Sequence, residues 1–250
     1  MQKFFVKNEQ IKDDTVEILG EDTKHIVSVL RLKKGNKIII CNKGLKVSYE
    51  AEIVNISNDK VECKILSKIN ETTESNVNVT IFQGLPKADK MEYIIQKATE
   101  LGVKEIYPVA MQRSIVKIAS KDKAKKINRW QKIAESASKQ SGRDIIPTVQ
   151  NIIRINELVS LIKNYDIFLV AYEKEKSKDL KSVLKKVDIK KDGKNLKIGV
   201  LIGPEGGISE EEIEILSREN IEIVTLGNRI LRTETASLVI LSNIMYEYEM

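Results

Sequence analysis

The sequence contains few of the side chains on which many metal sites and catalytic triads depend. Among 250 residues it has one histidine, His25, and two cysteines, Cys41 and Cys63. A single imidazole argues against a His-rich metal site and makes a His-dependent triad a poor hypothesis. The cysteines lack CxxC spacing and fall in predicted strands, so we expect buried core thiols and no metal.

Long apolar runs and aromatic residues are also scarce. No stretch of about 18 apolar residues occurs, which is the length that a transmembrane helix needs. The first ten residues, MQKFFVKNEQ, lack the apolar core of a signal peptide. Aromatic residues make up 5% of the chain and charged residues 31%, a composition typical of soluble proteins. We therefore expect a cytoplasmic protein that has no membrane partner.

Positive charge is concentrated in one segment. The formal net charge is +6, and residues 113–144 contain ten Lys or Arg against three acidic residues. Such a run is compatible with a solvated helix face. It is equally compatible with a surface that binds the phosphates of a nucleic acid. Trp130 and Tyr107 lie near this segment and are candidates for stacking on bases, although an isolated tryptophan is more often a core residue.

The chain divides into two regions of different pattern. Residues 1–72 contain short strands around one helix at 22–31, in which Asp22 is the expected cap. This pattern predicts a small barrel. The polar stretch SKINETTESN, residues 67–76, is the best candidate for a linker.

Residues 73–250 alternate between strands and helices, which predicts an α/β domain with a parallel sheet. The expected strands are 78–83, 105–109, 166–171, 196–202 and 221–225. The expected helices are 88–101, 122–140, 177–186, 209–219 and 233–248.

The stretch LIGPEGGIS, residues 201–209, joins an apolar strand to a glycine-rich loop and a helix. It matches neither a P-loop nor the GxGxxG dinucleotide motif. Glu205 and the glutamates at 210–212 would repel a phosphate, so a neutral or cationic ligand fits better. Ser209 and Glu212 are spaced as a capping box. The alternative is a tight structural turn without a ligand.

A second stretch, LGNRILRTETA at residues 226–236, also leads from a strand into a helix. Together the two stretches resemble the SPOUT superfamily of S-adenosyl-L-methionine-dependent methyltransferases. Within it they resemble the RsmE family, which methylates N3 of a uridine in 16S ribosomal RNA. The resemblance spans nearly the whole chain and includes QKATELGVKEIYPV (96–109), RSIVK (113–117), SASKQSGRDIIP (136–147) and HIVSVLRLKKGNKI (25–38).

The resemblance implies a fold and its partners. Residues 1–72 would form a PUA-like RNA-binding barrel, and residues 73–250 a SPOUT domain with a C-terminal trefoil knot. The substrate would be 16S ribosomal RNA or the small ribosomal subunit. SPOUT relatives are homodimers, and the last helix has apolar residues around much of its circumference, so we expect it at a two-fold interface. These residues are Leu238, Ile240, Leu241, Ile244 and Met245.

The resemblance also implies a pocket for S-adenosyl-L-methionine, lined by three loops. Its glycines would let the backbone approach the adenosine, and its apolar residues would sandwich the adenine. Some of the apolar residues also fit an ordinary strand core. The residues expected to bind the cofactor are Ala171, Leu201, Ile202, Gly203, Gly206, Gly207, Leu226, Gly227, Ile230 and Leu231.

Methylation of uridine N3 requires loss of the N3 proton, so a base or a stabiliser of negative charge is needed. Arg232 is the candidate for stabilising charge on the uracil oxygens. Glu234 or Glu205 is the candidate base if burial raises its pKa. Each acid also has a structural alternative, in a helix's first turn or as a loop tie. The expected RNA-binding residues are Arg31, Arg113, Lys123, Lys126 and Arg143.

Two other functions stay open. A related SPOUT enzyme that methylates a ribose 2′-hydroxyl would share the cofactor pocket. A non-catalytic RNA-binding protein of ribosome assembly would keep the basic segment and need no cofactor. The N-terminal barrel motif and QSGR favour the base methylase, and intact GPEGG and RTETA argue against the non-catalytic protein.

Overall fold

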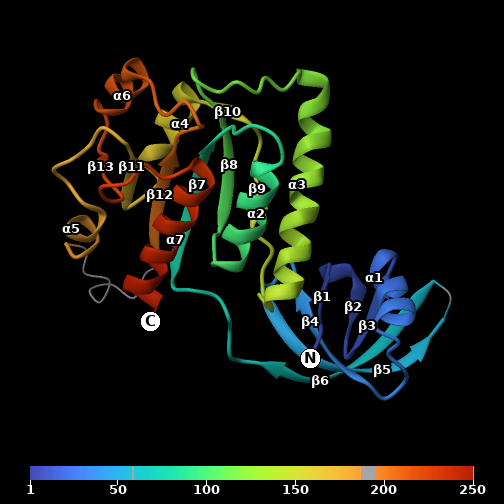
Figure 1. The fold of residues 1–250 in the computed structure, drawn as a ribbon. Helices are drawn as coiled ribbons and strands as arrows, with labels where there is room; N and C mark the ends of the chain where they lie inside the picture. Colours follow the sequence, from blue (N-terminus) through green and yellow to red (C-terminus); the bar gives the residue numbers. More distant parts are fainter. Residues whose placement is uncertain (58, 187–194, 250) are drawn as a thin grey trace. The chain divides into compact units, whose positions relative to one another are not determined.

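A computed structural model describes residues 1–57, 59–186 and 195–249 (Figure 1). Two compact units are present: one combines Met1–Glu74 with Ser138–Ile146, and the other combines Ser75–Ala137 with Pro147–Met250. The expected first domain, residues 1–72, did not include residues 138–146, which belong to the first unit. Among the described residues, no helix has both the length and the apolar content to cross a bilayer.

The first unit is built on one six-stranded sheet. Its strand order is β1 (Lys3–Val6), β4 (Lys37–Asn42), β5 (Val47–Ile56), β6 (Lys60–Ile69), β3 (Thr15–Leu19) and β2 (Ile11–Lys12). β1 runs parallel to β4 and the other pairs are antiparallel. Within the described residues no pairing joins β1 to β2, so hydrogen bonding leaves the predicted barrel open between these strands. Phe4, Ile40 and Ile53 are among the residues of its core.

The helix expected at 22–31 is present but begins earlier and changes type. After η1 (Asn8–Gln10) and β3, α1 (Glu21–Lys24) continues into a π-helical turn, η2 (His25–Val29). The N-cap residue is Gly20 and no side chain caps the helix, so the prediction for Asp22 is wrong. Asp22 lies inside the first turn, where its Oδ1 accepts a hydrogen bond from Lys139 Nζ at 2.7 Å.

Two carboxylates, Glu74 and Asp144, hold residues 138–146 in the first unit. Asp144 Oδ1 lies 2.6 Å from Lys3 Nζ, and its Oδ2 accepts from Thr73 N at 2.8 Å. Glu74 Oε2 lies 2.5 Å from Arg143 Nη2, and its Oε1 accepts from Asp144 N at 2.9 Å. Burial alone would raise the pKa of Asp144, but hydrogen bonds from Lys3 and Thr73 outweigh it and lower that pKa. We call Glu74, Arg143 and Asp144 the carboxylate clasp; it anchors the polar stretch expected to be a linker.

The second unit contains the predicted parallel sheet. Its strand order is β10 (Ile153–Arg154), β8 (Glu105–Ala110), β7 (Val77–Gly84), β12 (Leu196–Ile202), β11 (Ile167–Ala171) and β13 (Glu222–Val224), with β9 (Thr148–Val149) paired to β8. All of these pairs are parallel. The parallel α/β prediction is confirmed.

The helices of this unit are α2 (Lys90–Glu100), α3 (Ser120–Ser141), α4 (Ile155–Ile162), α5 (Leu180–Leu184), α6 (Glu210–Leu216) and α7 (Thr233–Glu249), although residues 138–141 of α3 belong to the first unit. All except α4 were expected. The signal for α4 is present in its buried residues Ile155, Leu158 and Ile162, which share one helical face. Two-residue strands such as β9 and β10 carry too little periodicity to be found in sequence.

Helices cover both faces of the parallel sheet (Figure 1). On one face, α4 and α6 pack on a core that includes Phe82, Phe168 and Leu201. On the other, α7 contacts β7, β12 and the neighbouring helix α2. Trp130 is 4% exposed. Tyr107 stacks on Phe82, with ring centroids 4.9 Å apart. Trp130 is therefore a core residue that is not free to stack on a base, whereas Tyr107 is half-buried and its stacking on a base stays a prediction.

Most of the apolar residues of α7 belong to the chain's own core. Ile240, Leu241 and Ile244 are fully buried, and Met245 is 4% exposed. Only Leu238 of the expected interface set is half-buried. The apolar circumference of α7 is therefore explained mainly by packing against the sheet and α2. Cys41 and Cys63 are buried free thiols, as expected, and burial raises the pKa of Cys63 to about 12.

Candidate active site

A cavity of about 500 Å³ lies at the carboxyl ends of β11, β12 and β13. Three chain segments line it: residues 171–173 after β11, residues 202–207 after β12, and residues 225–233 between β13 and α7. Lys90 and Ala236 complete the wall. Parallel sheets of this kind bind ligands at the carboxyl ends of their strands.

Nine of the ten residues expected to bind the cofactor line this cavity: Ala171, Ile202, Gly203, Gly206, Gly207, Leu226, Gly227, Ile230 and Leu231. Leu201 does not line it and lies fully buried in the core with Phe82 and Val170. Adjacent residues of a strand point to opposite faces, so Leu201 and Ile202 cannot share one environment. Lys90 on α2 also lines the cavity and was not predicted. The other lining residues that were not predicted adjoin the expected residues or loops: Tyr172, Glu173, Pro204, Thr225, Asn228, Arg229, Thr233 and Ala236.

The predicted capping box fixes the end of the 202–207 loop. Ser209 Oγ accepts from Glu212 N at 3.1 Å, and Glu212 Oε2 accepts from Ser209 N at 3.1 Å. Glu212 also binds outside its own helix, because its Oε1 accepts from Gln112 N at 2.8 Å. The cap therefore ties the loop to the segment that follows β8.

Two loop glycines are needed for packing within the protein. A Cβ added at Gly206 would lie 2.9 Å from Arg113 Cβ, and one at Gly203 would lie 3.0 Å from the carbonyl carbon of Gly207. Arg113 Nη1 also donates to Gly206 O at 3.1 Å. At Gly203 and Gly206, the close approach is therefore made by the chain itself.

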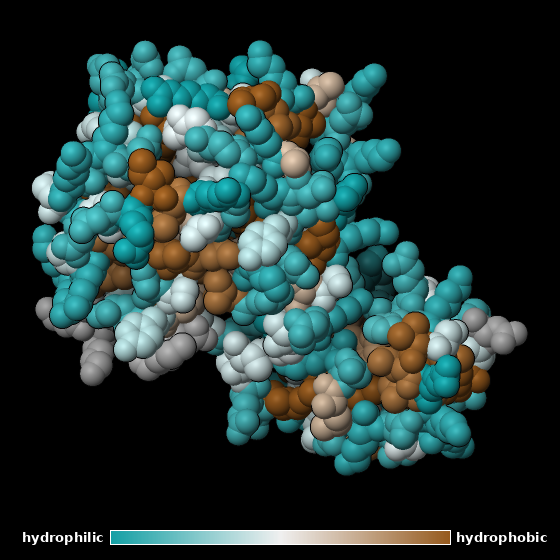
Figure 2. Space-filling view, in the orientation of Figure 1, coloured by the Kyte–Doolittle hydropathy of each residue, from teal (hydrophilic) through white to brown (hydrophobic). Residues whose placement is uncertain are grey.

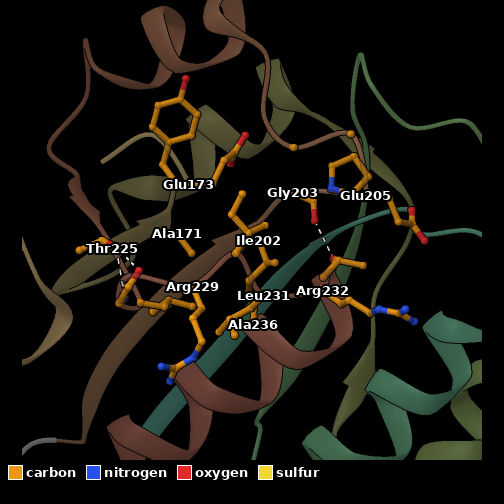
Figure 3. A pocket seen from close by; sticks show the side chains of 18 of the residues that line it. Ala171, Glu173, Ile202, Gly203, Glu205, Thr225, Arg229, Leu231, Arg232 and Ala236 are labelled. Carbon is orange, nitrogen blue, oxygen red and sulfur yellow. Dashed lines mark hydrogen bonds between the residues drawn. The ribbon is translucent and has the colours of Figure 1, made fainter. Parts of the chain in front are cut away.

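Gly207 and Gly227 instead have positive φ angles, +71° and +116°. A side chain at either position is strained, at a cost of about 1–2 kcal/mol. At Gly207 an added Cβ would also collide with Glu173 Oε1. The Glu173 carboxylate therefore lies close to the glycine loop in the cavity wall (Figure 3).

A buried polar network lies directly beneath the loop. Gln83, at the end of β7, donates from Nε2 to Thr233 Oγ1 at 2.8 Å, and Thr233 Oγ1 donates to Gly203 O at 2.7 Å (Figure 3). Ser237 Oγ donates to Gln83 Oε1 at 2.5 Å. Gln83 and Ser237 are fully buried. These bonds connect the sheet, the glycine loop and the start of α7.

The two candidate bases are joined by one lysine. Lys90 Nζ lies 3.0 Å from Glu205 Oε1 and 3.2 Å from Glu234 Oε2. Glu205 lines the cavity, whereas Glu234 does not. Glu234 Oε2 is buried and accepts no hydrogen bond, so the charge of Lys90 is its compensation.

The pKa of Glu205 does not move in the direction that a base would need. Burial alone raises it, but the backbone N–H groups of Glu205 and Lys87 and the Lys90 ammonium outweigh burial and lower it. The same two carboxylates raise the pKa of Lys90. The expectation that burial raises the pKa of Glu205 is therefore wrong, because the lysine was not foreseen.

Arg232 is exposed and lines the cavity at its junction with α7. Its side chain and that of Arg229 leave the connecting segment in different directions (Figure 3). Arg232 O accepts from Ala236 N at 2.8 Å, so the first turn of α7 holds its backbone. The Arg232 guanidinium is thus held at the cavity edge by a backbone that is fixed at the start of α7.

The residues expected to bind RNA are not all available for phosphates. Lys123 and Lys126 are exposed on α3, and Arg31 is exposed in the first unit with a φ of +52°. Arg113 is exposed but holds the glycine loop. Arg143 is 5% exposed and paired with Glu74, so its side chain is structural and does not match the expected surface contact.

Comparisons with known proteins identify both parts of the chain. A family model described as an RNA methyltransferase domain matches residues 73–245, and one described as an RNA methyltransferase PUA domain matches residues 18–66. The ribosomal RNA small subunit methyltransferase E of Bacillus subtilis is 38% identical over 100% of this chain and 98% of its own length. The protein of that name from Mesomycoplasma hyopneumoniae is 31% identical over 97% and 98%.

Solved structures agree with these matches. The crystal structure of the Neisseria gonorrhoeae ribosomal RNA small subunit methyltransferase E bound to S-adenosyl methionine has a TM-score of 0.84 and 30% identity, covering 99% of this chain and 98% of its own. A Legionella pneumophila methyltransferase with bound cofactor has a TM-score of 0.83 and 29% identity, covering 98% and 96%. The α/β methyltransferase fold with a PUA-like N-terminal domain is confirmed, and the chain belongs to the ribosomal RNA small subunit methyltransferase E family.

Proposed function

We propose that this chain transfers a methyl group from S-adenosyl-L-methionine to N3 of a uridine in 16S ribosomal RNA of the small subunit. The observation that carries this proposal is the cavity formed by the GPEGG and LGNRILRTETA segments at three neighbouring strand ends. Membership of the methyltransferase family and the cofactor named in two structural relatives support it. The proposed ribosomal substrate agrees with the cytoplasmic location expected from the sequence.

The chemistry of the cavity fits the proposed cofactor. Ile202, Leu226 and Leu231 offer apolar surface, and the loop backbone offers N–H and C=O groups that can read an adenine edge. The lining includes two carboxylates, Glu173 and Glu205, which suit a cationic sulfonium, together with the cations Lys90, Arg229 and Arg232. When bound, the cofactor supplies an electrophilic methyl group, so neither a metal nor a covalent enzyme intermediate is required.

Arg232 carries the chemical step in this proposal. Loss of the N3 proton places negative charge on N3 and the uracil oxygens, and a guanidinium at the cavity edge stabilises that charge until N3 takes the methyl group and the methyl–sulfur bond breaks. The proton acceptor is sought among Glu234 and Glu205. Glu205 lines the cavity, but its pKa is lowered. Glu234 has an oxygen without a hydrogen bond, but it does not line the cavity and is paired with Lys90, which does.

Identification of the methylated nucleoside tests the reaction. Purified 16S ribosomal RNA and small subunits are incubated with the protein and labelled S-adenosyl-L-methionine, and the RNA is digested to nucleosides. The proposal requires 3-methyluridine. A 2′-O-methylated nucleoside would establish the related ribose methylase, and RNA binding without label transfer would establish a non-catalytic protein.

Substitution of Gly207 tests the donor site. We expect Gly207→Val to weaken binding of S-adenosylhomocysteine at least about tenfold, equivalent to about 1.4 kcal/mol, because the new side chain forces the loop and Glu173 apart. Isothermal calorimetry measures this affinity. Gly35→Val is the matched control, since Gly35 has a φ of +90° and lies in the first unit. Equal affinity of folded Gly207→Val and wild-type protein would exclude the assigned pocket.

The division into a PUA-like RNA-binding domain at 1–72 and a SPOUT domain at 73–250 is part of the same proposal, as is the trefoil knot. The knot rests on the family resemblance. The chain leaves β13 beside β11, lines the cavity and continues into α7, which contacts β7. Arg31, Lys123 and Lys126 are the proposed RNA contacts that are exposed.

A homodimer is the remaining element of the proposal. Tyr93 on α2 is 47% exposed and Tyr246 on α7 is 69% exposed. Leu238 and Val239, also on α7, are half-buried. Figure 2 shows apolar surface over α7 on this face. We expect light scattering at micromolar concentration to give twice the chain mass of 28.4 kDa, and Tyr246→Glu to shift it toward the monomer. A single monomeric species in the wild type would refute the dimer.

A further inference from the structure

A second cavity, of about 670 Å³, lies in the second unit and is not used by the methyl-transfer site. It is formed where β8 and β10 end, by the segment 110–118, the first turns of α3 and α4, and Leu85 after β7. Among the residues that the structure describes, none lines both this cavity and the one beside the glycine loop. It is therefore a separate site on the same sheet edge.

The two cavities share a wall. Met111, Gln112 and Ser114 line the second cavity, while Arg113 between them packs on Gly206 of the first. Gln112 N donates to Glu212, which caps the helix after the glycine loop. Only the short turn 111–114 separates the two cavities, so an RNA strand with one nucleotide in the first cavity can place another in the second.

The second cavity combines apolar surface with positive charge. Its half-buried residues include Val116, Ile118 and Ile152, which offer a surface for a flat ring. Lys117, Lys123 and Arg154 are exposed at its rim. Glu157 is the one acid among the lining residues, and its Oε2 accepts from Arg154 N at 2.9 Å. Apolar walls below a ring of cations suit a nucleobase with its phosphates.

We propose that this second cavity holds a nucleotide of the RNA strand that neighbours the methylated uridine. Its base lies against Val116, Ile118 and Ile152, and its phosphates are neutralised by Lys117, Lys123 and Arg154. The inference rests on the proposed RNA methylation and extends it, because the second site fixes which uridine reaches the first cavity. It gives Lys117 and Arg154 a role in substrate choice.

Chemical probing of bases tests this site on the RNA that the wild-type protein methylates. At saturating protein, wild type should protect one base beside the methylated uridine from base modification. Ile152→Trp fills the cavity with a larger side chain, so that base should become reactive and RNA affinity should fall about tenfold. Val116→Trp fills the same cavity from another segment, in case Ile152→Trp does not fold.

Charge removal gives an independent measurement. Arg154→Ala should lower the salt dependence of RNA binding by about one unit of slope. Lys163→Ala removes a cation at the other end of α4 and should leave both protection and slope unchanged. Protection that persists in both filled variants, or equal slopes for Arg154→Ala and wild type, would overturn the second site. Normal donor binding and 3-methyluridine formation by wild type would show that the proposed reaction survives that failure.

Discussion

Arg232→Ala is expected to lower the single-turnover rate of RNA methylation by about 10² or more while the protein binds S-adenosylhomocysteine nearly as well as wild type. The size is that of losing one preorganised group that stabilises developing charge. The Arg232 side chain makes no hydrogen bond or ion pair to the glycine loop among the described residues, so the cofactor cavity should keep its shape. Single-turnover methylation at saturating RNA separates the chemical step from binding.

Two further variants give this measurement its controls. Arg232→Lys keeps the charge but loses the planar fork, so it should recover only part of the rate. Lys126→Ala, on the exposed face of α3, should weaken RNA binding and lower its salt dependence by about one unit of slope. A wild-type rate for Arg232→Ala would remove its catalytic role and direct attention to Glu234 and Glu205.

Glu74→Ala is expected to destabilise the first unit by about 3–5 kcal/mol, the usual cost of breaking a buried ion pair by removing one of its members. The side chain of Arg143 is 6% exposed and that of Glu74 is 17% exposed, so the guanidinium has little contact with water. Asp144 N also loses its acceptor. Hydrogen exchange of the β1 and β4 amides should accelerate, whereas the fluorescence of Trp130, which belongs to the second unit, should change less.

The double variant Glu74→Ala with Arg143→Met removes both charges and should regain part of the stability. Glu214→Ala is the surface control, because Glu214 and its partner Arg218 have side chains 73% and 70% exposed. An exposed pair contributes about 0–1 kcal/mol. A Glu74→Ala effect no larger than that of Glu214→Ala would show that the carboxylate clasp does not hold the unit.

Local signals explain most of what the sequence could predict. The Ser209–Glu212 capping box is visible because both partners lie within one helical turn. The parallel sheet follows from alternating strands and helices, and the cavity residues from two motifs at strand ends. The family resemblance added the cofactor, and the comparisons agree with it.

Pairings between distant residues explain what the sequence could not predict. Lys90 meets Glu205 and Glu234 only after folding, and that contact reversed the expected pKa direction for Glu205. Arg143 in QSGR looked like a phosphate contact until its partner Glu74 was known. Leu201 was assigned to the cavity beside Ile202, although the pleat of a strand separates neighbouring side chains.

The carboxylate clasp has a consequence for how this protein folds during synthesis. Glu74 belongs to the first stretch of the unit, whereas Arg143 and Asp144 lie beyond Ala137, where the chain returns from the second unit. A nascent chain that ends before residue 143 offers Lys3 and Glu74 no partners from the clasp. The N-terminal strands therefore cannot reach their final stability when they leave the ribosome, and must wait until the intervening segment has followed them.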